Sequence, residues 1–321
     1  MALPFESRFA LRIVDFIMQK RALGFLYADG EKFLYRFDQY CAERFPDEDR
    51  LTKDICLSWA VMRDTEASSS FRNRIGPIRE FAKYLNAIGE QAYIITHNYG
   101  KKRVRLTPYI YSEDEIASIW DELDCIEPSE SCLVRHLVIP AYMRLLYCCG
   151  LRPCEAFKLM ASEVDLNSGK IYIRESKGHK DRMVMLADDV REYYRDYNER
   201  MAQIVYGRDF FFSTVDNMPY SLDAIRRYFN YVKEKLRIQK MGSASPRLYD
   251  FRHTFATHRL YHWLREGKDL SVMLPYLSAY MGHAKLSATY YYIHLVPGQL
   301  EAMSGLDFSR YNELLPEVEH Q

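Results

Sequence analysis

The sequence predicts a mainly α-helical protein with one small antiparallel β-sheet, preceded by a separate all-α domain. Apolar residues recur at three- and four-residue spacing from residue 6 to about residue 85, which is the period of an amphipathic helix. Three short segments with strand character follow one another between residues 163 and 186, separated by turn sequences. From residue 221 onward the helical pattern returns. A chain of 321 residues that is 48% hydrophobic is long enough for two domains.

The first domain, residues 1–107, is expected to be a bundle of four helices. Breaks between these helices are expected at residues 28–30, 45–47 and 67–70, where glycine, proline and serine interrupt the apolar pattern. The serines are expected to cap the last helix, over residues 70–87. The helical spacing is clearest at Phe9, Ile13, Phe16, Ile17, Phe33, Phe37 and Tyr40.

A dense basic cluster, formed by Lys101, Lys102, Arg103 and Arg105, follows the predicted bundle. Clustered cations of this kind suit a polyanion such as DNA, and a solvated linker is the alternative interpretation. The second domain is expected to cover residues 108–300, with residues 301–321 as a tail. Its first helix should begin after Ser112, since acidic residues in the first turn follow this N-cap.

In the second domain, a long apolar helix is expected over residues 131–149. This helix should stop at Gly150, and a further helix should run over residues 152–160, which places Arg152 at a helix start. The predicted sheet is a three-stranded antiparallel meander. Its strands are expected at residues 163–166, 170–174 and 182–186, with Lys177 in the second turn.

The composition argues against several classes of protein. The seven cysteines are an odd number without paired C-x-x-C spacing, so we expect reduced thiols rather than a zinc site. No apolar run approaches the roughly 20 residues of a membrane-spanning helix, and the N-terminus lacks the pattern of a signal peptide. The protein is therefore expected in the cytoplasm, with no membrane partner.

Charge bears on a DNA partner in two ways. A net charge of zero argues weakly against one, because neutralising phosphates supplies much of the affinity of DNA-binding proteins. However, residues 1–107 hold 18 basic residues against 14 acidic ones, whereas residues 301–321 hold 1 against 5. The acidic excess therefore belongs to the tail.

Six residues that lie far apart in the sequence together suit a phosphodiester. They are Arg152, Lys177, Tyr249, Arg252, His283 and Tyr292. Two arginines can bind the non-bridging oxygens of a phosphate, lysine and histidine can transfer protons, and a tyrosine can be the nucleophile. Each residue is common by itself, and the combination indicates DNA strand transfer.

The ordered motifs around these residues resemble those of the tyrosine recombinases, or phage integrase family. The resemblance covers about residues 6 to 300, and rests on Gly-Leu-Arg-x-x-Glu, a hairpin lysine, Arg-His-Thr-Phe-Ala-Thr, Met-Gly-His and a tyrosine nine residues after that histidine. It implies a helical, SAM-like core DNA-binding domain followed by an α+β catalytic domain. The chain resembles simpler members of the family, without an extra arm-binding domain.

The resemblance implies a role for each cation of the site. Arg152 and Arg252 would bind the scissile phosphate and stabilise the charge of the transition state, and Glu155 would orient the loop around Arg152. Lys177 would protonate the departing 5′ oxygen, with Lys180 as a nearby alternative.

The resemblance also selects the nucleophile. His283 would hydrogen-bond the phosphate and assist the attacking tyrosine. The family spacing selects Tyr292 over its neighbours Tyr290 and Tyr291. Without that spacing, the three tyrosines would be interpreted as an aromatic helix that packs on the core.

Tyr249 is the main departure from the family, which usually has histidine at this position. A phenol with a reference pKa of about 10 can donate a hydrogen bond but is a poor proton shuttle near neutral pH, so Tyr249 is expected to bind the phosphate. His253 is expected to turn away from the face of Arg252 and to pack. His258 and His262 have i, i+4 spacing without an accompanying carboxylate motif, so no metal site is expected.

The function implied is that of a site-specific recombinase that cleaves and rejoins double-stranded DNA through a 3′-phosphotyrosine, without metal, ATP or another cofactor. Integration or excision of a mobile element is the expected task, by a homotetramer on DNA associated with the nucleoid. The tail would dock on a neighbouring protomer or on its own domain. A type IB topoisomerase-like relaxing enzyme and a non-catalytic DNA-binding regulator of the same fold are the alternatives.

Overall fold

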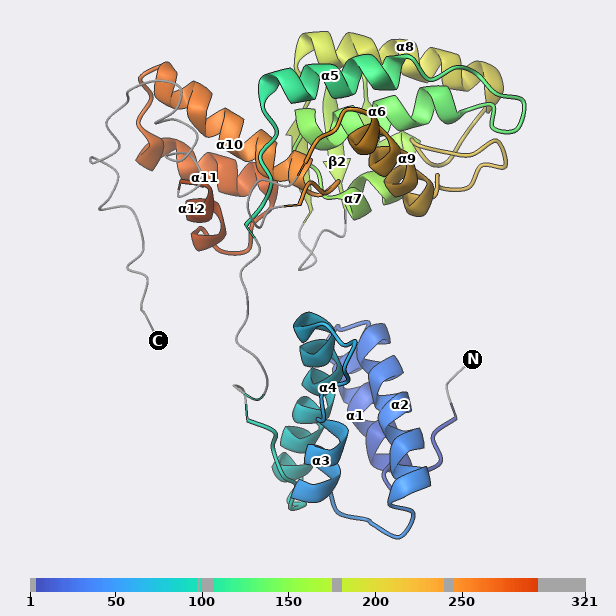
Figure 1. Ribbon diagram of the computed structural model, residues 1–321, viewed down its shortest axis with the longest axis vertical. Coiled ribbons are helices and arrows are strands. Elements are labelled where there is room, and N and C mark those ends of the chain that lie inside the picture. Colours follow the sequence, from blue (N-terminus) through green and yellow to red (C-terminus); the bar gives the residue numbers. More distant parts are fainter. Residues whose placement is uncertain (1–3, 97–98, 100–106, 175–180, 240–244, 294–321) are drawn as a thin grey trace. The chain divides into compact units, whose positions relative to one another are not determined.

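The chain divides into two compact units, Met1–Arg105 and Leu106–Gln321 (Figure 1). The computed structural model describes residues 4–96, 99, 107–174, 181–239 and 245–293. The predicted basic cluster of Lys101, Lys102, Arg103 and Arg105, the hairpin lysine Lys177 and the tail at residues 301–321 lie outside the described residues. Among the helices that the structure describes, none is long and apolar enough to cross a membrane.

The described part of the first unit holds the four helices that the sequence predicts. Their apolar faces meet in one core, in which Phe16, Phe37 and Phe81 are almost completely buried. Burial of aromatic rings from different helices stabilises the bundle. The helices are α1 (Ala10–Ala22), α2 (Ala28–Arg44), α3 (Lys53–Trp59) and α4 (Ser68–Ala87).

Two expected helix boundaries in this unit are wrong. Residues 28–30 do not break the chain, because they form the first turn of α2, where acidic residues favour the helix N-terminus. The break precedes them, and it ends at Tyr27, which has a φ of 54°. The serines at residues 68–70 lie inside the first turn of α4, whose N-cap is Ala67 without a side-chain cap.

The second unit is built around α6, which is buried on most of its surface and contacts α5, α8 and α10 (Figure 1). The N-cap at Ser112 and the acidic first turn of α5 are as predicted, and Glu115 completes a capping box with Ser112. Helix α8 was not predicted. The helices are α5 (Glu113–Asp124), α6 (Arg135–Cys148), α7 (Pro153–Lys158), α8 (Asp188–Ile204), α9 (Leu222–Lys235), α10 (Asp250–Arg265), α11 (Leu270–Met281) and α12 (Ser287–Ile293).

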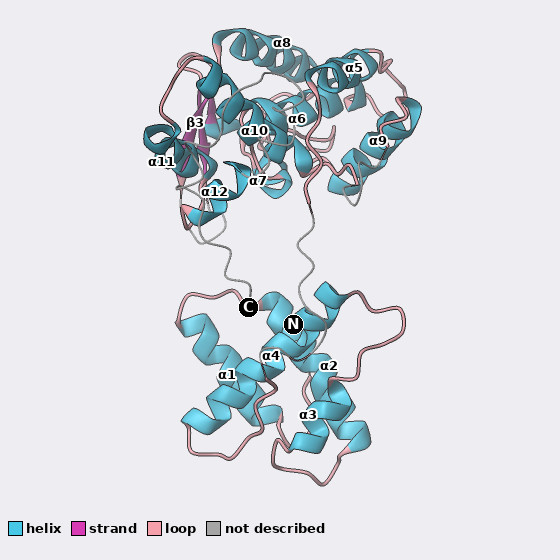
Figure 2. Ribbon diagram, turned by 60° about the vertical axis from the view of Figure 1, so that its left-hand side comes forward, coloured by secondary structure: helices cyan, strands magenta, loops and turns pink. Residues whose placement is uncertain are grey.

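The sheet is the predicted three-stranded antiparallel meander, in the order β1-β2-β3. Its strands are β1 (Val164–Asp165), β2 (Lys170–Ile173) and β3 (Arg182–Met185). Ile171 and Val184 are register partners and are fully buried, so one face of the sheet belongs to the core. Strand β3 packs beside α11 (Figure 2).

Helix α10 joins two hydrophobic clusters of this unit. Phe251 belongs to the main cluster, whereas Phe255 and Leu260 belong to a smaller one that also contains residues of α11 and α12. Because both clusters bury part of α10, the helix cannot rotate without exposing apolar surface. The residues between the two clusters, Arg252 and His253, are thereby held in a fixed orientation.

Candidate functional site

Three consecutive backbone carbonyls at the C-terminal end of α11 each accept a hydrogen bond from a different arginine. The distances are 2.9 Å from Arg182 Nε to Tyr280, 2.6 Å from Arg252 Nη2 to Met281 and 3.0 Å from Arg152 Nη2 to Gly282. The last carbonyls of a helix have no partner within the helix and carry a partial negative charge, so they attract cations. This helix end therefore gathers side chains from β3, α10 and the start of α7.

Arg252 is the most enclosed of these cations, with 1% of its surface exposed. Its second hydrogen bond, of 2.5 Å, runs from Nη1 to the carbonyl of Gly150. Burial, together with the nearby charge of Arg152, lowers the pKa of Arg252 to about 10. Among the described residues, no acidic side chain forms an ion pair with Arg252, so the guanidinium is held by carbonyl dipoles.

Arg152 is the N-cap of α7, as the sequence predicts, and is held by Glu155 in the first turn. Glu155 accepts from the Arg152 backbone N–H at 2.9 Å and from Nη1 at 2.6 Å. Burial raises the pKa of Glu155, but hydrogen bonds from Arg182 and Arg152 outweigh burial and lower it to about 2. The carboxylate therefore stays ionised and fixes Arg152, which is the orienting contact expected of Glu155.

Tyr292 lies between two histidines and is 3% exposed. His253 Nδ1 is 3.1 Å from the Tyr292 hydroxyl. The ring of His283 is stacked on the ring of Tyr292, with centroids 6.0 Å apart and planes 16° apart. His283 itself is held by Thr289, whose Oγ1 lies 2.7 Å from Nδ1.

The site disfavours protonated histidine and ionised tyrosine alike. Burial, followed by the charges of neighbouring arginines, lowers the pKa of His283 to about 3 and that of His253 to about 4. Burial also raises the pKa of Tyr292 well above its usual value, although Arg252 and Arg152 act in the opposite direction. At neutral pH all three side chains are therefore uncharged in the protein without DNA.

Tyr249 stands at the rim of the same site and is 39% exposed. Its ring meets His253 edge-on, with centroids 5.1 Å apart. Its phenol hydrogen-bonds with Arg152, and its electrostatic interaction with Arg252 opposes the lowering of the pKa of that guanidinium by burial. Tyr249 and Arg252 therefore lie at the same site, as their spacing predicts.

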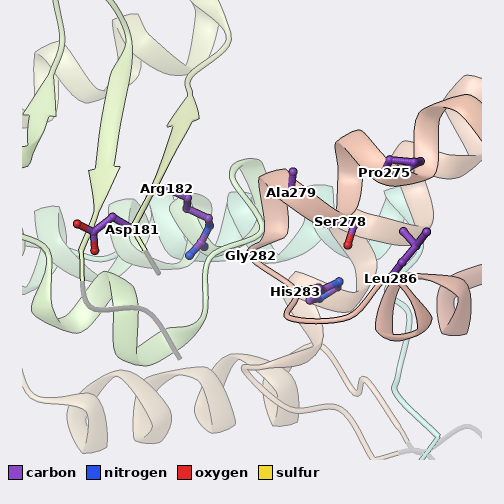
Figure 3. A pocket seen from close by; sticks show the side chains of 8 residues that line it. All are labelled: Asp181, Arg182, Pro275, Ser278, Ala279, Gly282, His283 and Leu286. Carbon is purple, nitrogen blue, oxygen red and sulfur yellow. The ribbon is translucent and has the colours of Figure 1, made fainter. Parts of the chain in front are cut away.

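A cavity of about 420 Å³ opens beside this cluster (Figure 3). One wall comes from Asp181 and Arg182 at the start of β3, and the other comes from α11 and the loop that follows it, including His283. The polar side chains along its edge are those of Asp181, Arg182 and His283, and apolar side chains of α11 lie behind them. The edge thus carries a carboxylate beside the cation, and the cavity lies next to the arginine cluster rather than within it.

The structure thus brings together Arg152, Tyr249, Arg252, His283 and Tyr292, five of the predicted site residues. It does not test Lys177, which lies outside the described residues. Within the described ranges, no group of three or more His, Cys, Asp or Glu residues could hold a metal ion.

The prediction that His253 turns away from the site is wrong. The position that follows Arg252 does point to a different side of α10, but α12 packs on that side and brings the Tyr292 hydroxyl to it. Arg182 is a second site residue that was not predicted, because a cation at the start of a strand resembles an ordinary surface residue. For His253 and for Arg182, the only available signal was that each lies close in sequence to a predicted site residue.

Comparison with known proteins identifies the fold and the family. The family model described as "Phage integrase family" matches residues 111–298. The Sinorhizobium fredii protein y4rB, named as an integrase/recombinase, is 28% identical over 94% of this chain and 98% of its own length. Tyrosine recombinase XerC of Lacticaseibacillus casei is 27% identical over 73% of this chain and 74% of its own length.

Among solved structures, the Tn1549 transposon integrase in complex with transposon right end DNA has the same fold. The two structures agree with a TM-score of 0.62 at 13% sequence identity, over 91% of this chain and 99% of the other. The ordered motifs, the site that they form and the match to the family model agree, and the chain belongs to the phage integrase family of tyrosine recombinases.

Proposed function

We propose that this protein is a site-specific DNA recombinase that cleaves and rejoins DNA strands through a 3′-phosphotyrosine formed on Tyr292. One observation supports the proposal above all others: Arg152, Arg252 and the stacked pair of His283 and Tyr292 converge on the end of α11. These residues come from different parts of the chain, and their convergence supports a shared role in binding one phosphate.

The charges of the site suit a phosphodiester. Two guanidiniums stand close enough that Arg152 lowers the pKa of Arg252, and in the described part of the chain carbonyl dipoles rather than an acid hold Arg252. A phosphate would supply the missing negative charge, and its oxygens gain further charge when phosphorus becomes pentacoordinate. Fixed cations that face such developing charge stabilise the transition state more than the ground state.

The proposed reaction is a transesterification at phosphorus. The Tyr292 oxygen attacks phosphorus and loses its proton, an O–P bond forms, and the bond from phosphorus to the 5′ oxygen breaks. Lys177 is proposed to give a proton to the departing 5′ oxygen, and Tyr249 to bind a phosphate oxygen together with Arg152. One phosphoester bond replaces another, so rejoining to a new strand needs no ATP. The two arginines are proposed to supply the positive charge that a metal ion would otherwise provide.

The assembly and the task are also proposals. Lys101, Lys102, Arg103 and Arg105 are proposed to bind the DNA backbone, and four protomers to act on two DNA duplexes. Integration or excision of a mobile element is the proposed task, in keeping with the names of y4rB, an integrase/recombinase, and of the Tn1549 transposon integrase. The separate helical unit and the spacing from His283 to Tyr292 favour recombination over relaxation alone.

The test is a covalent trapping assay. Nicked DNA duplexes with the sequences that flank the gene in its genome would be incubated with the wild type, Tyr292→Phe and Tyr291→Phe. The products would then be separated on a denaturing gel. We expect a protein–DNA adduct with the wild type and Tyr291→Phe, and none with Tyr292→Phe. An adduct that persists in Tyr292→Phe would assign the nucleophile to another residue.

Two other outcomes would select the alternatives. Duplexes that are bound but never form an adduct would indicate a non-catalytic DNA-binding regulator. An adduct accompanied by relaxation of a supercoiled plasmid, without strand exchange between two duplexes, would indicate a relaxing enzyme of the type IB topoisomerase class.

A further inference from the structure

His253 is the side chain that the Tyr292 hydroxyl contacts directly. The Nδ1 atom is 3.1 Å from the hydroxyl oxygen, within hydrogen-bonding distance, and the ring centroids are 5.6 Å apart. His253 belongs to α10 and Tyr292 to α12, two helices that pack against each other. The contact is therefore set by the packing of the domain.

The other groups around Tyr292 are less suited to receive its proton. His283 stacks on the tyrosine ring, and its Nδ1 is occupied by Thr289 at 2.7 Å. Tyr249 is a phenol, which is a poor proton acceptor near neutral pH. Among the described residues, His253 is the neutral base that already touches the nucleophile.

We infer that His253 accepts the proton of Tyr292 as this tyrosine attacks the phosphodiester, an inference that rests on the proposed function. In this step the Tyr292 O–H bond breaks, the new O–P bond forms, and the proton passes to His253 Nδ1. The imidazole becomes an imidazolium, and the 5′ oxygen leaves with a proton from Lys177, its proposed donor. His253 is then a catalytic residue, because it touches the reacting oxygen.

The surroundings of His253 restrict this transfer to the complex with DNA. Burial, then Arg247 and Arg252, lower its pKa to about 4, and the titratable groups Tyr249, His283 and Tyr292 also face it. In the free protein His253 is thus neutral, and its Nδ1 lone pair is available when Nε2 carries the proton. A bound phosphodiester offsets the two arginines and favours the imidazolium, so proton transfer accompanies bond formation to phosphorus.

The experiment measures single-turnover cleavage of the nicked duplex by wild type, His253→Asn and His253→Gln. Asparagine places an amide oxygen near the position of Nδ1, so it preserves the hydrogen bond to Tyr292 but cannot take a proton. We expect both variants to cleave about 100-fold more slowly than wild type. His262→Gln, at an exposed position near the other end of α10, is the matched control and should cleave at the wild-type rate.

A second substrate separates the two proton transfers. In a duplex whose 5′ bridging oxygen is replaced by sulfur, the leaving group needs no proton. A variant that lacks the proton donor for the leaving group therefore regains its cleavage rate on this duplex. We expect no rescue of the His253 variants on this duplex. The wild-type rate should also fall as the pH drops below the pKa of His253 in the complex, and the rate of His253→Asn should not.

Three results would overturn the inference. His253→Asn that binds DNA and cleaves within about threefold of wild type would reduce the histidine to an orienting contact. Rescue of the His253 variants by the sulfur substrate would place the histidine on the leaving-group side. Wild-type protein that binds the duplex without forming any adduct would overturn the proposed function and the inference together. The first two results would overturn the inference alone, so the two failures are distinguishable.

Discussion

The carboxylate of Glu155 binds the guanidinium of Arg182 at two points, with hydrogen bonds of 2.7 and 2.9 Å. Both side chains are almost completely enclosed, with 4% and 7% of their surfaces exposed. The same carboxylate binds Arg152, and Arg182 also donates to the carbonyl of Tyr280. This buried pair therefore connects the start of α7, the start of β3 and the end of α11, which are the elements that form the site.

Glu155→Gln is expected to lower both stability and cleavage. The variant leaves the buried Arg182 without its counterion, and breaking a buried pair typically costs about 3–5 kcal/mol. The free energy of unfolding in urea measures this cost. Glu192→Gln, which affects a surface pair with Arg195, is the control and should cost less than about 1 kcal/mol. Equal stabilities for the two variants would show that the Glu155 pair contributes no more than a surface contact.

The pH dependence of stability should show two separate losses. His253 and His283 have pKa values of about 4 and about 3 in the folded protein, below the ordinary value of 6.5, so the unfolded chain binds their protons first. Stability is then lost as the pH falls below about 6.5. Glu155, with a pKa of about 2 against an ordinary 4.5, contributes stability that is lost between those values.

Variants assign each loss to its residues. Unfolding free energies measured from about pH 7 to about pH 3 should show a smaller first loss when His253→Asn and His283→Asn are combined. The second loss should be smaller in Glu155→Gln. A first loss of unchanged size in the double histidine variant would contradict the assignment.

Gly150→Ala should disturb the backbone that holds the Arg252 side chain. Gly150 has a φ of 58°, its carbonyl accepts from Arg252, and an added Cβ would lie 2.5 Å from the Phe255 ring. Gly207→Ala is the matched control, since Gly207 has a φ of 61° and open space around it. Strain alone should cost about 1–2 kcal/mol in the control, and the clash should add about 1–3 kcal/mol in Gly150→Ala. Thermal unfolding that does not distinguish the two variants would refute this account.

Tyr249→Phe tests whether Tyr249 binds the phosphate or transfers protons. Removing one hydrogen bond to charged groups should slow cleavage about 10-fold, and the shape of the pH–rate profile should not change, because binding needs only the neutral phenol. Single-turnover rates over a range of pH provide the measurement. A profile that loses one of its limbs would instead make Tyr249 a proton-transfer group.

Much of the fold follows from local sequence signals. The meander at residues 163–186, the cap at Ser112 and the helix stop at Gly150 each follow from a short pattern of turn, capping or strand residues. Helix α8 was not predicted because charged residues dominate its sequence. Tyr194, Tyr197 and Met201 are nevertheless buried at helical spacing.

The sequence by itself determined the family, the order of most of the elements and the identity of most candidate site residues, since these depend on local patterns and on motif order. Only the tertiary structure decided that His253 reaches Tyr292 and that Arg182 joins Arg152 and Arg252 at the end of α11. Both contacts join residues from different elements. They depend on how helices are rotated and packed against one another, and that is set by the burial of apolar surface throughout the domain rather than by any neighbouring residue.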